Sequence, residues 1–202
     1  MSRPETQSVI DMLRRLFVSK VRVKLLETYF SHPDKLYYGR QLSRQLGEQI
    51  NAVRREIENL QKIGLLKGEK RGNRIYFCLD RKFIHYEALL LLVVKSTGLG
   101  KEIIKNQSRL GRIRWVFFSK VFALHQDRPG EMIDIFVVGD VVLPELSSLI
   151  AEEERARKGE VNYSVMDEAE FRFRFQGKDP FLINLLTAPR LTILGDEAQL
   201  LS

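Results

Sequence analysis

The sequence predicts an α+β protein of two different domains, with a boundary between residues 98 and 99. Charge divides the chain near this point: residues 1–100 contain 19 Lys and Arg against 10 Asp and Glu, whereas residues 101–202 contain 14 against 16. The hydrophobic pattern also changes, because helical periods dominate the first half and strands alternate with helices in the second. We expect a basic, mainly helical N-terminal domain that meets a polyanion, followed by a small α/β domain.

Helices are expected over most of residues 8–63. Apolar residues recur at steps of three and four from residue 8 to residue 30, which predicts one or two helices with a single buried face. A short helix is expected in residues 38–47, because Leu42 and Leu46 are one turn apart and Gly47 is suited to end it. A third helix is expected over residues 49–63. Its apolar face would consist of Ile50, Val53, Ile57, Leu60 and Ile63.

The period changes after Gly64. Two short extended runs, residues 65–67 and 74–79, flank a tip rich in glycine and basic residues, so we expect a β-hairpin. Residues 82–100 are nearly all apolar and predict one long helix that ends at Gly98 and Gly100. A helix that is apolar on every side is buried on every side, either in a homodimer interface or between the two halves of one chain.

Three helices followed by a hairpin predict a winged helix-turn-helix that binds duplex DNA. Arg54 and Arg55, with Asn51 one turn earlier, are expected near the start of the third helix, where side chains reach base edges in the major groove. Basic residues of the second helix and of the hairpin tip are placed for phosphates or the minor groove. The expected DNA-binding residues are Arg40, Arg44, Gln49, Asn51, Arg54, Arg55, Lys70, Arg71, Asn73 and Arg74. A solvated basic face without a partner is the alternative.

About residues 10–100 resemble the winged-helix transcriptional regulators of bacteria and archaea of the ArsR type, without that group's metal-binding cysteines. The likeness lies in "SKVRVKLLETYF", "YYGRQLSRQLGEQINAVRREIENLQKIGLLKGEKRGNRIYF" and "LLLLVVKSTGLG". It implies a sequence-specific transcriptional regulator in which residues 49–63 form the recognition helix and residues 67–77 the wing. Residues 49–52 depart from the hydroxyl-rich opening that is common in this group, which leaves fewer hydroxyls for phosphate contacts.

The hydrophobic pattern of the second half predicts alternating strands and helices. A helix is expected in residues 101–113, and a strand, a loop and a second strand in "FFSKVFALHQDRPGEMIDIFVVGD", residues 117–140. An amphipathic helix is expected after Pro144, with Leu146, Leu149 and Ile150 facing inward. A strand in residues 160–167, a helix opened by Asp167, a helix in residues 180–189 and a final extended segment in residues 190–196 complete a small α/β domain.

About residues 100–200 resemble the minimal nucleotidyltransferase family, in which a strand ending in Gly-Ser and an Asp-x-Asp strand precede a helix and a third acidic strand. Aligned on "IDIFVVGD", the likeness places the Gly-Ser pair at Ser119 and Lys120, the two metal-binding aspartates at Met132 and Asp134, and the third acid at Asn162. Magnesium needs paired carboxylates on one strand face, and a thioether is a poor ligand for it. We therefore expect a degenerate, non-catalytic domain without cofactor or metal, which would serve contacts to a small-molecule effector, a protein or a second copy.

Two other interpretations of the second half stay open. Asp134 would work with Asp127, Glu131 or Asp140 at a rebuilt metal site, which would make the protein an active metal-dependent nucleotidyltransferase with a DNA-binding targeting or autoregulatory domain. Alternatively, the acidic helix around residues 151–160 would dock another protein, although a solvated face explains that run as well.

Several classes of protein are disfavoured by composition. The single cysteine, Cys78, excludes an internal disulfide, and the three histidines lack metal-ligand spacing. The apolar run at residues 88–94 is far shorter than the ~20 residues of a membrane span. We expect a cytoplasmic homodimer that binds double-stranded DNA and no membrane.

Overall fold

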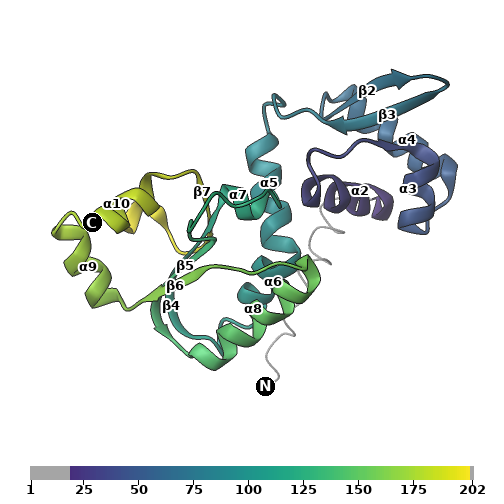
Figure 1. The fold of residues 1–202 in the computed structure, drawn as a ribbon. Helices are drawn as coiled ribbons and strands as arrows, with labels where there is room; N and C mark the ends of the chain where they lie inside the picture. Colours follow the sequence, from purple (N-terminus) through teal and green to yellow (C-terminus); the bar gives the residue numbers. More distant parts are fainter. Residues whose placement is uncertain (1–18, 201–202) are drawn as a thin grey trace. The chain divides into compact units, whose positions relative to one another are not determined.

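The computed structural model describes residues 19–200 (Figure 1). The chain divides into two compact units between Val93 and Val94, inside helix α5 (Tyr86–Ser96). The expected helical segment of residues 8–30 is described only from residue 19 onward, and its earlier part lies outside the described residues. We call residues up to Val93 the N-terminal unit and residues from Val94 the C-terminal unit, and each is described by itself.

The N-terminal unit combines helices with a small antiparallel sheet. Its elements before α5 are α2 (Lys20–Ser31), β1 (Tyr37–Tyr38), α3 (Gly39–Leu46), α4 (Ile50–Lys62), β2 (Leu66–Arg71) and β3 (Arg74–Leu79). The strand order is β1-β3-β2, and both pairs are antiparallel. Two helices joined by a tight turn and followed by a hairpin are the arrangement of a winged helix-turn-helix, so this unit resembles winged helix-turn-helix regulators.

Helix α4 is amphipathic as the sequence predicts. Val53, Ile57 and Leu60 are buried with the apolar side chains of α2, whereas the opposite face is exposed. The prediction that Ile63 belongs to the buried face is wrong, because its side chain is 58% exposed. The reason is that α4 ends at Lys62, so Ile63 lies outside the helix and the chain turns away at Gly64.

The turn between α3 and α4 is held by several hydrogen bonds. Gly47 ends α3 in the left-handed region at φ 64°, where a residue without Cβ is favoured. The Ser43 hydroxyl donates to the carbonyl of Glu48 at 2.7 Å. Lys24 of α2 donates to the carbonyl of Leu46 at 2.8 Å and to the Glu48 carboxylate at 2.6 Å. The hydrogen bond and charge of Lys24 lower the pKa of Glu48, so α2 and this turn are tied together by an ion pair.

The hairpin is longer than the sequence predicts. Strands β2 and β3 pair along their whole length, and the turn consists of Gly72 and Asn73 alone. Gly72 adopts φ 59°, which a two-residue hairpin turn requires. Lys70 and Arg71 were expected on a flexible tip, but they lie on β2 opposite Ile75 and Arg74.

The prediction of a single helix over residues 82–100 is wrong. Helix α5 ends at Ser96, and a separate helix, α6 (Gly98–Lys105), begins after Thr97. Thr97 is extended at φ −136°, and Ser, Thr and Gly are weak helix formers that favour helix ends. Apolar character alone therefore did not reveal the break.

The C-terminal unit contains a four-stranded mixed sheet with helices on both sides (Figure 1). After α6 its elements are β4 (Gly111–Ser119), α7 (Lys120–Ala123), β5 (Ile135–Val141), α8 (Leu143–Arg157), β6 (Tyr163–Met166), α9 (Glu168–Gln176), α10 (Pro180–Thr187), β7 (Arg190–Leu194) and the 3-10 turn η1 (Glu197–Leu200). The strand order is β6-β5-β4-β7; β5 and β6 are parallel, and β4 is antiparallel to both neighbours. The mixed α+β class is thus confirmed.

An aromatic core covers one face of this sheet. Trp115, Phe117 and Phe136 of β4 and β5 pack with Phe171 of α9 and Leu182 of α10. Helices α6 and α8 lie on the other side, and α8 buries Leu146 and Ile150 as the sequence predicts. No helix among the described residues is long and apolar enough to cross a membrane.

Two boundaries in the C-terminal unit differ from the sequence prediction. The helix expected over residues 101–113 ends at Lys105, and β4 already begins at Gly111. Strand β5 begins at Ile135, so Met132 and Asp134 do not share a strand face as expected. Asp134 is the last residue before the strand, where its backbone N–H donates to the carbonyl of Asn162.

Candidate nucleic-acid interface

All ten residues expected to contact DNA are exposed, and they come from three neighbouring elements of the N-terminal unit. Helix α3 carries Arg40 and Arg44, and α4 carries Asn51, Arg54 and Arg55, with Gln49 as its N-cap residue. The hairpin carries the other four, namely Lys70, Arg71, Asn73 and Arg74.

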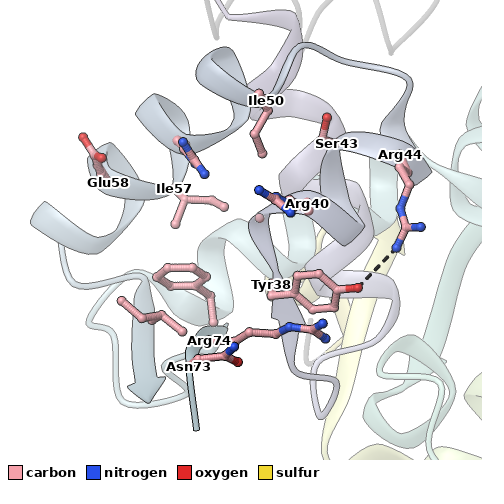
Figure 2. A pocket seen from close by; sticks show the side chains of 13 residues that line it. Tyr38, Arg40, Ser43, Arg44, Ile50, Ile57, Glu58, Asn73 and Arg74 are labelled. Atoms are coloured by element: carbon pink, nitrogen blue, oxygen red, sulfur yellow. Dashed lines mark hydrogen bonds between the residues drawn. The ribbon is translucent and has the colours of Figure 1, made fainter. Parts of the chain in front are cut away.

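A groove of about 950 Å³ runs between α3, α4 and the hairpin (Figure 2). Half of the expected residues line it: Arg40, Arg44, Arg54, Asn73 and Arg74. Apolar side chains line it as well, namely Ile50, Ile57, Ile75 and Phe77. We call this feature the arginine groove. Its cationic groups can meet the phosphates of a nucleic acid, while its apolar parts exclude water around those contacts.

The other five expected residues lie outside the lining of the groove: Gln49, Asn51, Arg55, Lys70 and Arg71. Arg71 forms a double hydrogen bond with Glu69, at 3.0 and 3.1 Å. This hydrogen bonding and the opposite charge raise the pKa of Arg71 and lower that of Glu69. The charge of Arg71 is therefore neutralised locally by Glu69, so Arg71 is less suited to contact a phosphate.

Tyr38 lies at the centre of the groove and was not identified from the sequence (Figure 2). Its hydroxyl accepts a hydrogen bond from Arg44 at 3.2 Å, and the Arg74 guanidinium lies 4.9 Å from its ring centroid. The Tyr76 ring packs edge-on against it at 5.6 Å. One tyrosine thus positions an arginine from α3 and another from β3. The pairing of β1 with β3 that brings them together joins distant parts of the chain, so local patterns gave no signal for it.

Glu56 anchors the buried face of α4. Its side chain is 4% exposed, and its carboxylate accepts a hydrogen bond from Arg22 of α2 at 2.8 Å. Burial raises the pKa of Glu56, but hydrogen bonds from Ser19 and Arg22 and the charge of Arg22 outweigh it, so the pKa is lowered overall. This pair fixes how α4 sits on α2 and so turns Arg54 and Arg55 outward.

One acidic residue, Glu58, also lines the arginine groove. It lies one turn after Arg54 on the exposed face of α4. A carboxylate here repels a polyanion, so it lowers the affinity of the groove for a nucleic acid and disfavours ligands that would place a phosphate beside it.

In the C-terminal unit, four of the five positions of the expected degenerate nucleotidyltransferase site line one cavity: Ser119, Lys120, Met132 and Asp134. The fifth, Asn162, is bonded to them, since its backbone N–H donates to Asp134 at 2.9 Å and its amide to the carbonyl of Met132 at 3.5 Å. The Ser119 hydroxyl accepts from the N–H of Phe122 and so caps α7. The structure therefore brings together residues that the sequence places far apart.

Asp134 is buried and forms an ion pair with Arg128 at 2.7 Å. The expected alternative partner Asp140 lies near the other end of β5 and pairs with Arg112 at 2.7 Å. Within residues 19–200, no three His, Cys, Asp or Glu side chains are grouped so that they could hold a metal ion. The carboxylate of Asp134 is thus already neutralised by an arginine.

Comparisons with known proteins find little. No family model and no curated protein matches the chain. Reduced HlyU from Vibrio cholerae is 18% identical, over 42% of this chain and 84% of its own, with a TM-score of 0.32. The transcriptional regulator Tm0710 from Thermotoga maritima is 20% identical, over 52% of this chain and 71% of its own, with a TM-score of 0.38. The winged helix-turn-helix arrangement of the N-terminal unit is evident from its own element order and strand pairing.

Proposed function

We propose that the protein is a transcriptional regulator that binds duplex DNA in a sequence-specific way through its N-terminal unit. The observation that carries this proposal is the arginine groove, in which Arg40, Arg54 and Arg74 come from three separate elements and line one surface. Scattered surface charge does not converge in this way. A helix-turn-helix beside a hairpin is also the arrangement that places one helix in the major groove.

The contacts divide into two kinds. Asn51, Arg54 and Arg55 lie on the exposed face of α4, in or near its first turns, and there they read base edges. Arginine pairs with guanine O6 and N7, and asparagine with an adenine edge. Arg40 and Arg74 bind phosphates, which set the position of the protein without specifying a sequence.

Fluorescence anisotropy with labelled duplexes tests the proposal. A duplex selected from a random library is compared with a scrambled duplex, over a series of salt concentrations. We expect affinity to fall steeply with salt, because each phosphate contact contributes a slope of about −0.9 in log K against log salt. Absence of binding at low salt would exclude the proposal.

Single variants separate the two kinds of contact. Arg54→Ala should relax the preference at one base pair and cost about 1–3 kcal/mol on the selected duplex. Arg40→Ala should weaken both duplexes alike and reduce the salt slope by about one. Arg81→Ala is the matched control, because Arg81 is an exposed arginine of the same unit that pairs with Asp34 outside the groove. If Arg81→Ala weakened binding as much as Arg54→Ala, only the total charge would matter.

We also propose that the C-terminal unit keeps a nucleotidyltransferase-like architecture without catalysis. The ion pair between Asp134 and Arg128 supports this, because a metal ion would have to displace the arginine. Incubation with labelled nucleoside triphosphates and Mg²⁺ tests it. Label incorporation that disappears in Asp134→Ala, in a sample that circular dichroism shows to be folded, would establish the active-enzyme alternative instead.

Finally, we propose that the regulator acts as a homodimer, since two copies would read two half-sites of an operator. The apolar segment of α5 supports the proposal, because a helix rich in leucine and valine needs an apolar partner surface. Light scattering after size-exclusion chromatography measures the mass directly. A stable monomer at micromolar concentration would count against it.

A further inference from the structure

The C-terminal unit contains a cavity of about 410 Å³ between the end of β4, the segment before β5, and α10. This volume lies in the range of about 300–1,000 Å³ that small-molecule sites occupy. Phe117 and Phe136 of the sheet are the most deeply buried residues of its lining. Exposed residues such as Pro129 and Phe181 also belong to the lining, so the cavity opens to solvent.

Apolar side chains from separate segments converge on this cavity while they remain partly exposed to water. Val121 comes from α7, Met132 and Ile133 from the segment before β5, and Leu185 from α10, and all four are half-buried. Single exposed apolar residues are ordinary, but several around one cavity leave apolar surface that a ligand can cover. Covering it contributes about 25 cal/mol for each Å² removed from water.

The aromatic rings of the cavity meet nearly at a right angle. The rings of Phe117 and Phe136 differ in orientation by 18°, whereas that of Phe181 stands at 80° to Phe136 with 6.4 Å between the centroids. Aromatic rings pair by offset stacking or by edge-to-face contact at about 4.5–7 Å. Phe181 is 38% exposed, so part of its ring is open to such a contact. A flat aromatic ligand can stack on one of these rings and meet the other edge-on.

The buried carboxylate of the lining is already neutralised. Asp134 forms an ion pair with Arg128 at 2.7 Å and accepts the backbone N–H of Asn162 at 2.9 Å. A metal ion or an organic cation at this carboxylate would have to displace the arginine. The other acid of the lining, Glu131, is exposed to water. The acidic groups therefore do not favour a cationic ligand.

The basic residues of the lining are also engaged within the protein. Arg190 donates to the carbonyl of Leu186, and its guanidinium lies 3.7 Å from the carboxylate of Glu197. The same guanidinium lies 5.3 Å from the centroid of the Phe117 ring. Lys120 likewise takes part in an interaction within the protein. An anionic ligand would lose its hydration and would have to break these contacts, whereas an uncharged ligand avoids both costs.

We propose that this cavity binds an uncharged, flat molecule of one or two aromatic rings. The ligand lies against Phe181 and the half-buried side chains of Met132 and Leu185, and it leaves the ion pairs of the lining intact. Methionine is flexible and polarizable, so it adapts to rings of different outline. The proposal concerns ligand binding alone and does not depend on DNA binding.

A competition assay on the full chain tests the proposal. Phenylnaphthylamine, an uncharged aromatic dye that fluoresces in apolar sites, serves as the probe. Methylnaphthalene, naphthoate and naphthylmethylamine share one ring system, but at neutral pH they are uncharged, anionic and cationic. We expect methylnaphthalene to displace the probe at about tenfold lower concentration than either ion, because a charge is costly to remove from water without a partner. Equal or stronger displacement by either ion would overturn the ligand class.

Two pairs of variants locate the site. Ala188→Phe fills the cavity and should abolish probe fluorescence, whereas Ala151→Phe, at an exposed position of α8, should not. Leu185→Ser removes apolar surface from the lining and should weaken probe binding by about tenfold. Ile183→Ser is its matched control, because Ile183 is an exposed residue of the same helix outside the lining. Fluorescence that survives Ala188→Phe would place the probe elsewhere and refute the site.

A measurement on the unaltered chain removes the dependence on variants that fold poorly. Methyl resonances of Met132, Ile133 and Leu185, which line the cavity, should shift on addition of methylnaphthalene, because an aromatic ring changes the magnetic field beside it. Methyl groups of Leu146 and Ile150, buried on α8, should not shift. Unchanged resonances of the three cavity residues at a saturating concentration would refute the site.

Discussion

The arginine groove of the N-terminal unit leaves its charged side chains at the surface, whereas the C-terminal cavity keeps its buried carboxylate, Asp134, in an ion pair with Arg128. Within residues 19–200, Arg40, Arg54 and Arg55 form no ion pair. A charge that is exposed costs little to maintain and remains available to a partner. A charge that is buried must be neutralised inside the fold. The first arrangement suits binding of a large external anion, and the second fixes the fold.

The largest expected effect is on stability and comes from the C-terminal unit. Asp134→Ala leaves the half-buried Arg128 without its partner, which we expect to cost about 3–5 kcal/mol in the free energy of unfolding. Urea denaturation followed by circular dichroism measures it. Arg54→Ala should stay within about 0.5 kcal/mol of the unaltered protein in the same assay, since Arg54 is exposed. Equal effects of the two variants would remove the contrast between the units.

A second effect on stability tests the anchor of α4. Glu56→Gln removes a buried carboxylate that accepts from Arg22, which should cost about 1–3 kcal/mol at neutral pH. Because the pKa of Glu56 is lowered from 4.5 in the folded protein, its contribution is complete above the unfolded pKa and is lost as the pH falls through the folded pKa. Urea titrations of both proteins between neutral pH and about pH 3 should therefore converge in acid. A gap that stays constant would show that the charge of Glu56 does not matter.

The next effect in size concerns the arrangement of the groove. Tyr38→Ala removes the surface on which Arg74 lies and the hydroxyl that Arg44 contacts, so we expect a loss in DNA affinity of about tenfold. Tyr38→Phe keeps the ring and should lose only a few-fold. Anisotropy on the selected duplex distinguishes them. Equal losses would assign the whole effect to the hydroxyl.

The smallest expected effect has the opposite sign. Glu58→Gln removes a carboxylate from the lining of the groove and should raise affinity for any duplex by a few-fold at low salt, with the gain decreasing as salt rises. Glu87→Gln is the matched control, because Glu87 is an exposed acid of the same unit outside the groove. An equal gain in the control would point to overall charge.

Local patterns sufficed for much of the N-terminal unit. The spacing of Val53, Ile57 and Leu60 predicted the buried face of α4, and Gly47 predicted the end of α3. These features depend on neighbours in the sequence. Glu56 and Tyr38 could not be predicted in the same way, because a buried acid depends on Arg22 from another helix and Tyr38 acquires its role through strand pairing with β3.

The C-terminal unit shows the same division. Asp167 correctly predicted the start of α9, since its side chain caps the helix by accepting the N–H of Glu170. The predicted start of β5 was wrong, because Met132 and Asp134 alternate like strand residues in the sequence. In the structure Asp134 lies just before the strand, where Arg128 and Asn162 hold it. The contacts of Ser119 with Arg190 and of Lys120 with Pro189 arise only from the pairing of β4 with β7, which sequence alone does not reveal.

Helix α4 separates the residues that hold it from the residues that would read DNA. Its position depends on Glu56, on the buried Val53, Ile57 and Leu60, and on the turn that Lys24 secures. The outward face makes no contribution to that support. Substitutions on this face can therefore accumulate without loss of the fold, so that related chains could acquire new target sequences one residue at a time while the scaffold stays unchanged.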